Sequence, residues 1–71
     1  MRTDTATITA NGESRQVELP LTLGEFLQTC GWRSSQVVVE LNGEVVRRNE
    51  IADRQLHGGD RVEIIVPVAG G

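Results

Sequence analysis

Residues 21–31 read Leu-Thr-Leu-Gly-Glu-Phe-Leu-Gln-Thr-Cys-Gly and carry the clearest helical pattern in the chain. Apolar residues recur there at the spacing that lines one face of a helix, namely Leu23, Phe26, Leu27 and Cys30. Thr22 and Glu25 stand three residues apart, as in a capping box at a helix start. Gly31 occupies the position where a helix commonly ends in the left-handed conformation. The stretch therefore predicts a short amphipathic helix that covers an apolar surface.

The residues before this helix predict a hairpin. Residues 5–10 and 15–19 alternate apolar and polar side chains, as strands with one buried face do. Asn11-Gly12 lies between them, and both residue types tolerate the positive φ that a two-residue hairpin turn requires. Pro20 cannot donate to a ladder and ends the second strand.

The residues after the helix predict three more strands. Residues 37–41, Val-Val-Val-Glu-Leu, are followed by the turn Asn42-Gly43 and a short return strand over 44–46. Residues 47–56 are polar, and Ile51 and Leu56 are expected to anchor a loop or helical turn to the core. Residues 61–66 predict the last strand, with Val62, Ile64 and Val66 facing inward.

The resulting order is β-β-α-β-β-β, which predicts a small α+β domain. The crossover through the helix implies a mixed sheet, with the helix packed on one face and the other face exposed. On that exposed face, alternation places Val38 and Ile65 outward. If their strands are neighbours, the two form an apolar pair that a protein partner can bind, although scattered exposed aliphatic residues are also common. Arg47-Arg48 is either a solvated edge or a contact for an acidic partner.

Composition excludes several classes of function. The chain has 71 residues and a net charge of −3, with no lysine and no basic stripe, which argues against nucleic-acid binding. No apolar run approaches the ~20 residues of a membrane-spanning helix. One cysteine cannot form an internal disulfide framework, so a cytoplasmic location is expected.

Residues suited to catalysis are scarce. The sequence has one His, one Cys and no Tyr, and it contains no metal-ligand set, phosphate loop or Ser/His/Asp arrangement. Cys30 fits the apolar face of the helix better than a sulfur relay, and His57 fits a solvated turn better than a catalytic base. The chain is therefore expected to be handled by enzymes and to need no cofactor of its own.

The last residues, Pro67-Val68-Ala69-Gly70-Gly71, suggest a chemical role. Four residues beyond a strand can reach about 13 Å at ~3.3–3.6 Å per residue. Gly70 and Gly71 lack a Cβ and fit a narrow channel in a partner. Because a carboxylate is a poor electrophile, a partner would have to activate it. A frayed end of small residues is the alternative interpretation.

Several features together resemble the ThiS family of ubiquitin-like β-grasp sulfur carriers. They are the element order, the Val-Glu-Leu-Asn-Gly-Glu stretch over 39–44, the Gly-Gly-Asp-Arg-Val turn over 58–62 and the terminal Gly-Gly. The family often has proline where Arg47 stands here. The resemblance implies a β-grasp domain over residues 1–67, with a sheet of four to five strands, and a flexible tail over 68–71.

The resemblance also implies a function. A ThiF-like adenylyltransferase would adenylate the Gly71 carboxylate, and sulfur from a cysteine desulfurase would convert it to a thiocarboxylate. A ThiG-like thiazole synthase would then take the sulfur for the thiazole of thiamine, with Val68, Ala69 and Gly70 forming the inserted tail. The chain would be a protein co-substrate and not an enzyme. The residues singled out above from the strand pattern and the charged edge, Val38, Ile65, Arg47 and Arg48, would contact its partners.

Three other functions remain open at this point. The ending also resembles MoaD-type carriers, which supply sulfur to molybdopterin. A ubiquitin-like protein modifier would instead join Gly71 to lysines of other proteins. A non-covalent β-grasp binding module would not need the terminal glycines.

Overall fold

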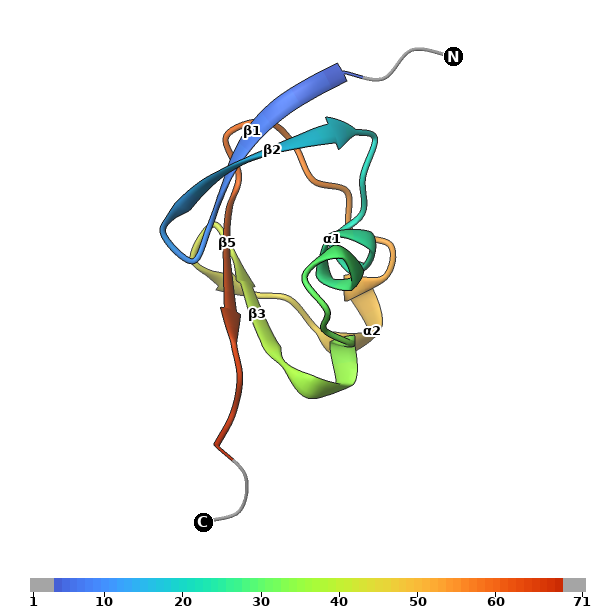
Figure 1. The fold of residues 1–71 in the computed structure, drawn as a ribbon. Helices are drawn as coiled ribbons and strands as arrows, with labels where there is room; N and C mark the ends of the chain where they lie inside the picture. The colour runs from blue at the N-terminus through green and yellow to red at the C-terminus, as the bar shows by residue number, and fades with distance from the viewer. Residues whose placement is uncertain (1–3, 69–71) are drawn as a thin grey trace.

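The computed structural model describes residues 4–68 and contains one five-stranded sheet with helices on one of its faces (Figure 1). Its elements are β1 (Asp4–Ala10), β2 (Glu13–Leu19), α1 (Leu23–Thr29), the 3-10 helix η1 (Ser34–Gln36), β3 (Val38–Leu41), β4 (Glu44–Val45), α2 (Arg48–Ile51) and β5 (Arg61–Ile65). None of the helices within residues 4–68 is long and apolar enough to cross a membrane.

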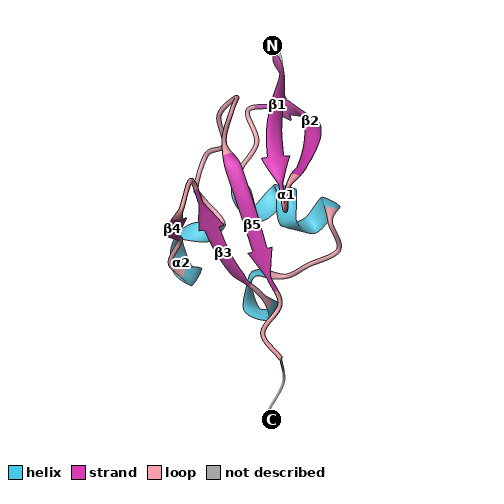
Figure 2. Cartoon of the chain, turned by 90° about the vertical axis from the view of Figure 1, so that its left-hand side faces the viewer, coloured by secondary structure: helices cyan, strands magenta, loops and turns pink. Residues whose placement is uncertain are grey.

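The strand order across the sheet is β2-β1-β5-β3-β4. β1 and β5 run parallel, and the other neighbours run antiparallel, which confirms the predicted mixed sheet. β5 lies in the centre, between the N-terminal hairpin and β3. Figure 2 shows the sheet from its open face, with α1 and α2 behind it.

α1 forms where the sequence predicts it. The Thr22 hydroxyl accepts a hydrogen bond from the Glu25 N–H at 3.1 Å, and the Glu25 carboxylate accepts one from the Thr22 N–H at 2.8 Å. This capping box satisfies two of the free N–H groups at the helix start. Gly31 follows the helix with φ +85°, a conformation that glycine adopts without steric cost.

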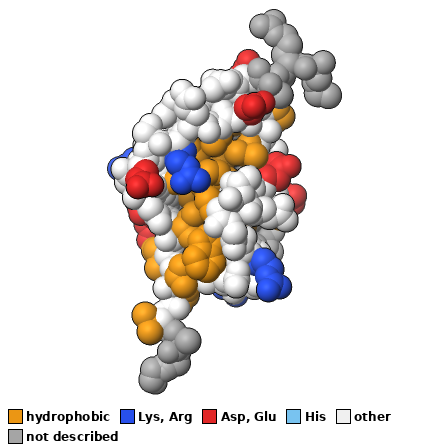
Figure 3. All heavy atoms as spheres, in the orientation of Figure 1, with side chains coloured by type: hydrophobic (Ala, Val, Ile, Leu, Met, Phe, Trp, Pro, Cys, Tyr) orange, Lys and Arg blue, Asp and Glu red, His pale blue; other side chains and the backbone are white. Residues whose placement is uncertain are grey.

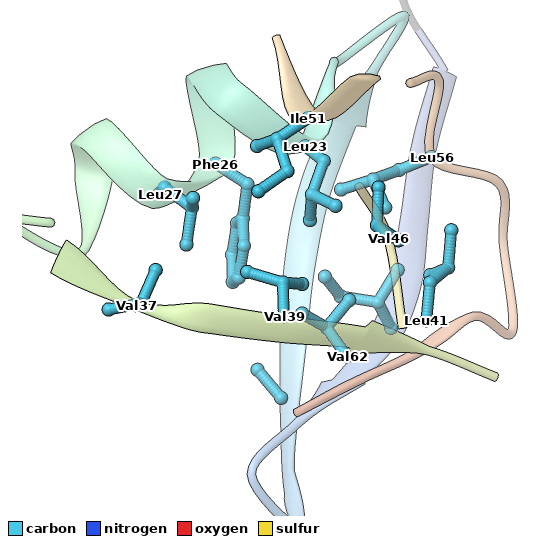
Figure 4. Close-up of a cluster of buried hydrophobic side chains, with 12 residues drawn as sticks. Leu23, Phe26, Leu27, Val37, Val39, Leu41, Val46, Ile51, Leu56 and Val62 are labelled. Carbon is cyan, nitrogen blue, oxygen red and sulfur yellow. The ribbon is translucent and has the colours of Figure 1, made fainter. Parts of the chain in front are cut away.

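The core lies between the sheet and the helices (Figure 4). Its buried side chains are Ile8, Ala10, Leu23, Phe26, Leu27, Val37, Val39, Leu41, Val46, Ile51, Leu56 and Val62. The predicted anchors Ile51 and Leu56 are both among them, and the turn that carries Ile51 is α2. Cys30 and Trp32 are half-buried and pack against this core, as does Ile64.

Several strand ends differ by one or two residues from the sequence-based expectation, since β1 begins at Asp4, β2 begins at Glu13 and β4 ends at Val45. β3 begins one residue late, although Val37 is buried as predicted. β5 ends at Ile65, and Val66 is 49% exposed, so the prediction that Val66 faces the core was wrong. The inward direction predicted for the other two residues is confirmed, since Val62 is buried and Ile64 is half-buried. Alternation along a strand predicts which face of the sheet a side chain points to. The side chain is buried only where another helix or strand packs against that face.

Candidate functional site

The C-terminal segment leaves the body where β5 ends. β5 stops at Ile65, and Val66, Pro67 and Val68 continue beyond it without regular structure (Figures 1 and 2). Val68 is 93% exposed, so the domain holds it by few contacts. Three predicted tail residues, Ala69, Gly70 and Gly71, lie outside the described residues.

Hydrophobic side chains gather between the sheet and α1, on the side of the molecule that Figure 3 shows. They form a band that runs down this side toward the tail. Trp32 and Ile64 are among the half-buried residues that pack against the core. Trp32, which follows the helix two residues past its C-cap Cys30, therefore covers part of the core.

The predicted apolar pair forms on the opposite, open face of the sheet. Val38 on β3 pairs directly with Ile65 on β5. Ile65 is 44% exposed, whereas Val38 is half-buried. The two strands are neighbours, so the condition set by the sequence is met. We call Val38 and Ile65 the docking pair.

The charge on this open face changes along β3 and β5. Glu40 pairs directly with Glu63, two residues from the docking pair on each strand. Within residues 4–68, no cation forms an ion pair with either carboxylate. Like charges in directly opposed positions destabilise a sheet. The open face thus carries the apolar pair next to the tail and two opposed carboxylates two residues farther from it.

Arg47 and Arg48 lie close to the docking pair. Together with Val38 and Val45 they line a hollow of about 190 Å³ at the short β4 edge. Arg47 is exposed, and the Arg48 Nε donates to the Ser34 carbonyl at 3.2 Å. Arg47 has a φ of −62°, a value that proline also adopts. Val38, Arg47 and Arg48 therefore share one hollow, and Ile65 is connected to it through its pairing with Val38.

The side chain of Asn11 contributes a contact that the sequence did not indicate. It hydrogen-bonds both backbone groups of Ile64, which is 53 residues away. The sequence identified Asn11 only as a turn residue. An Asn-Gly turn directly after a strand is the signal available, but it does not say which distant strand the side chain reaches.

Cys30 and His57, the two side chains weighed as catalytic candidates, lie in separate surroundings. Within residues 4–68, no group of three His, Cys, Asp or Glu side chains is placed to hold a metal ion. The Cys30 thiol is half-buried and accepts a long contact of 3.8 Å from the Arg15 guanidinium. His57 is exposed in a turn, where its backbone N–H donates to Asp60 at 2.8 Å.

The fold has close counterparts among solved structures. A crystal structure of the thiamine biosynthesis protein ThiS from Geobacter metallireducens matches with a TM-score of 0.77 at 32% identity, covering 92% of this chain and 99% of that one. The mixed five-stranded sheet with one main helix thus defines a ubiquitin-like β-grasp protein. The model of the ThiS family matches residues 5–71. The chain therefore belongs to the ThiS family, the sulfur carriers of thiamine biosynthesis.

Two relatives support this assignment. The sulfur carrier protein ThiS of Thermus thermophilus is 41% identical over 61 residues, which cover 86% of this chain and 94% of that protein. A thiazole synthase of Paramagnetospirillum magneticum is 34% identical over 61 residues, again 86% of this chain. This chain spans 19% of the length of that synthase. Family membership favours the thiamine carrier over the molybdopterin carrier, the protein modifier and the non-covalent binding module.

Proposed function

We propose that this chain carries sulfur to the thiazole of thiamine as a thiocarboxylate on Gly71. The observation that carries the proposal is the 93% exposure of Val68, three residues before Gly71, in a member of the ThiS family. An exposed segment that ends in two glycines can enter a narrow active site without steric hindrance from side chains. The chain would be a co-substrate, and its partners would supply the catalytic groups.

The first step would be activation by a ThiF-like adenylyltransferase. A Gly71 carboxylate oxygen attacks the α-phosphorus of ATP and pyrophosphate leaves, which gives an acyl-adenylate. The terminal sulfur of a persulfide, formed by a cysteine desulfurase, then attacks the acyl carbon and AMP leaves. Reduction of the resulting S–S bond by a thiol releases the thiocarboxylate. Covalent attachment keeps the sulfur on the carrier until it is transferred.

The docking pair would contact the adenylyltransferase. Val38 and Ile65 lie beside the strand end from which the tail leaves, so a partner that binds them is close to the tail. Arg47 and Arg48 border the same region and would meet acidic side chains of the partner. Charge complementarity of this kind mainly accelerates association and excludes wrong partners.

The recipient would be a ThiG-like thiazole synthase. The thiazole synthase relative supports this choice, because a segment similar to this chain forms part of that protein. A carrier domain and a synthase joined in one chain are expected to work in the same reaction. The single cysteine of the chain fits a reducing cytoplasm as the compartment.

Reconstituted sulfur transfer tests this function. The full chain is incubated with ATP, cysteine, a cysteine desulfurase, the adenylyltransferase and a thiazole synthase with its small-molecule substrates. The proposal predicts thiazole formation that depends on this chain. A parallel reaction contains the large subunit of molybdopterin synthase and its substrate. Sulfur delivery only in that reaction would contradict the thiazole assignment, and lysine-linked adducts would indicate a protein modifier.

A further inference from the structure

We infer that Asn11 is a positioning residue that holds the end of β5 and so sets the direction in which the tail leaves. The Ile64 N–H donates to the Asn11 Oδ1 at 2.7 Å, and the Asn11 Nδ2 donates to the Ile64 carbonyl at 3.2 Å. A side-chain amide offers one acceptor and two donors, much as a peptide group does. The Asn11 side chain therefore acts as one additional residue of the β1 ladder.

The local topology explains why β5 needs this contact. β1 ends at Ala10, and the chain turns away at Asn11-Gly12, with φ values of 49° and 82°. The Asn11 N–H still reaches the Val62 carbonyl at 2.9 Å. The backbone N–H and C=O groups of residues i and i+2 in a strand point to the same side. The groups of Ile64 therefore point, like those of Val62, toward the position that β1 would occupy if it continued past Ala10. The Asn11 side chain fills that place.

The contact lies directly before the segment that the proposed function uses. On its other side β5 is held by β3, through the pairing of Val38 with Ile65. Asn11 thus provides the second support at the last positions of β5, and Val66 to Val68 follow beyond it. Two supports restrict the angle at which the tail leaves, whereas one support allows the strand end to pivot. The inference rests on the proposed function, because it concerns delivery of Gly71 to the adenylyltransferase.

The chain contains a matched control for this residue. Asn42 also opens an Asn-Gly turn with positive φ, 53°. Its side chain makes two hydrogen bonds near β5 as well, accepting from the Arg61 N–H at 2.9 Å and donating to Asp60 at 3.0 Å. These contacts lie at the start of β5, the end opposite the tail. Asn42 therefore matches Asn11 in residue type, turn and number of contacts, and differs in position.

The test compares Asn11→Gly with Asn42→Gly in the full chain. Glycine keeps the positive φ at both turns and removes only the side-chain hydrogen bonds. ATP–pyrophosphate exchange with the adenylyltransferase gives kcat and KM for each variant. We expect kcat to fall about tenfold for Asn11→Gly with KM unchanged, since misplacement of a reacting group by about 1 Å can cost up to ~100-fold. Asn42→Gly is expected to keep both constants.

Amide hydrogen exchange supplies a readout that is independent of catalysis. Asn11→Gly should accelerate exchange at Ile64, whose N–H loses its acceptor, while exchange of the buried β1 amides stays slow. Asn11→Asp keeps the acceptor for the Ile64 N–H and tolerates positive φ, so it should restore part of the lost kcat.

An equal loss of kcat in both glycine variants, or no loss in Asn11→Gly, would overturn the inference. The reaction of the wild-type chain distinguishes a failure of the proposed function from a failure of the role assigned to Asn11. If the wild-type chain is never adenylated, the proposed function fails and this inference fails with it. If the wild-type chain reacts and Asn11→Gly reacts equally fast, only the role of Asn11 is refuted.

Discussion

Thr22 determines where α1 begins, because its hydroxyl and the Glu25 carboxylate satisfy two N–H groups that otherwise have no partner in the helix. Thr22→Ala removes one of these bonds and weakens the other. We expect the free energy of unfolding to fall by about 1 kcal/mol. Urea denaturation measures this loss. Gln28→Ala, on the exposed side of the same helix, is the control and should change stability by less than about 0.5 kcal/mol. An equal loss in both variants would contradict the capping role.

The capping box was predictable from the sequence, whereas the roles of the two turn asparagines were not. Thr22 and Glu25 are three residues apart, so their contact follows from local helix geometry. The side chains of Asn11 and Asn42 contact residues 53 and 19 positions away. Those contacts depend on which strands become neighbours in the sheet. A residue pattern that identifies a turn carries no information about this choice.

At the scale of elements, α1 packs closely on the segment that follows α2. A Cβ added at Gly24 would lie 3.0 Å from the Ala52 Cα, which is backbone and cannot rotate away. Overpacking costs about 1–3 kcal/mol, which equals or exceeds the ~1 kcal/mol that alanine gains over glycine in a helix. We therefore expect Gly24→Ala to destabilise the fold.

Thermal unfolding tests this packing. Gly58→Ala is the control, because the added Cβ would meet the Ala6 Cβ at an ordinary 3.5 Å. This variant should unfold within a few degrees of the wild-type chain. If Gly24→Ala proves more stable than the wild-type chain, α1 and α2 are less rigidly packed than described.

The docking pair belongs to the same scale, since it is formed by two neighbouring strands. Ile65→Glu places a charge on the partly exposed apolar surface beside the tail. We expect KM for the adenylyltransferase to rise about tenfold, as for truncation of an interface anchor, with an unchanged unfolding midpoint. Thr7→Glu adds the same charge on the open face of β1, away from the docking pair, and should keep KM. An unchanged KM in Ile65→Glu would refute the docking role.

Element positions were predictable only in part. The hairpins, α1 and most of the core follow from local patterns, and the pairing of Val38 with Ile65 was anticipated on the condition that their strands adjoin. The exposure of Val66 was not anticipated, because it depends on which elements lie opposite the strand end. The hollow that joins Arg47 and Arg48 to Val38 likewise requires the relative positions of β4 and α2.

At the scale of the whole molecule, the fold separates a packed body from a projecting segment. Within residues 4–68, the body buries twelve hydrophobic residues between sheet and helices. These core residues all lie between positions 8 and 62, so we expect removal of residues 70 and 71 to leave stability unchanged. The truncation should abolish formation of the thiocarboxylate, because the terminal carboxylate would then lie two residues closer to the packed body.

The most direct test of the account is fragment mass spectrometry of the chain after loading. The full chain is incubated with ATP, the adenylyltransferase and a persulfide donor, and it is then compared with the chain lacking residues 70 and 71. We predict one oxygen-to-sulfur exchange in the full chain, confined to the fragment that ends at Gly71, and none in the truncated chain. Sulfur found on Cys30, or an exchange that persists after truncation, would contradict the claim that this protein carries sulfur on Gly71.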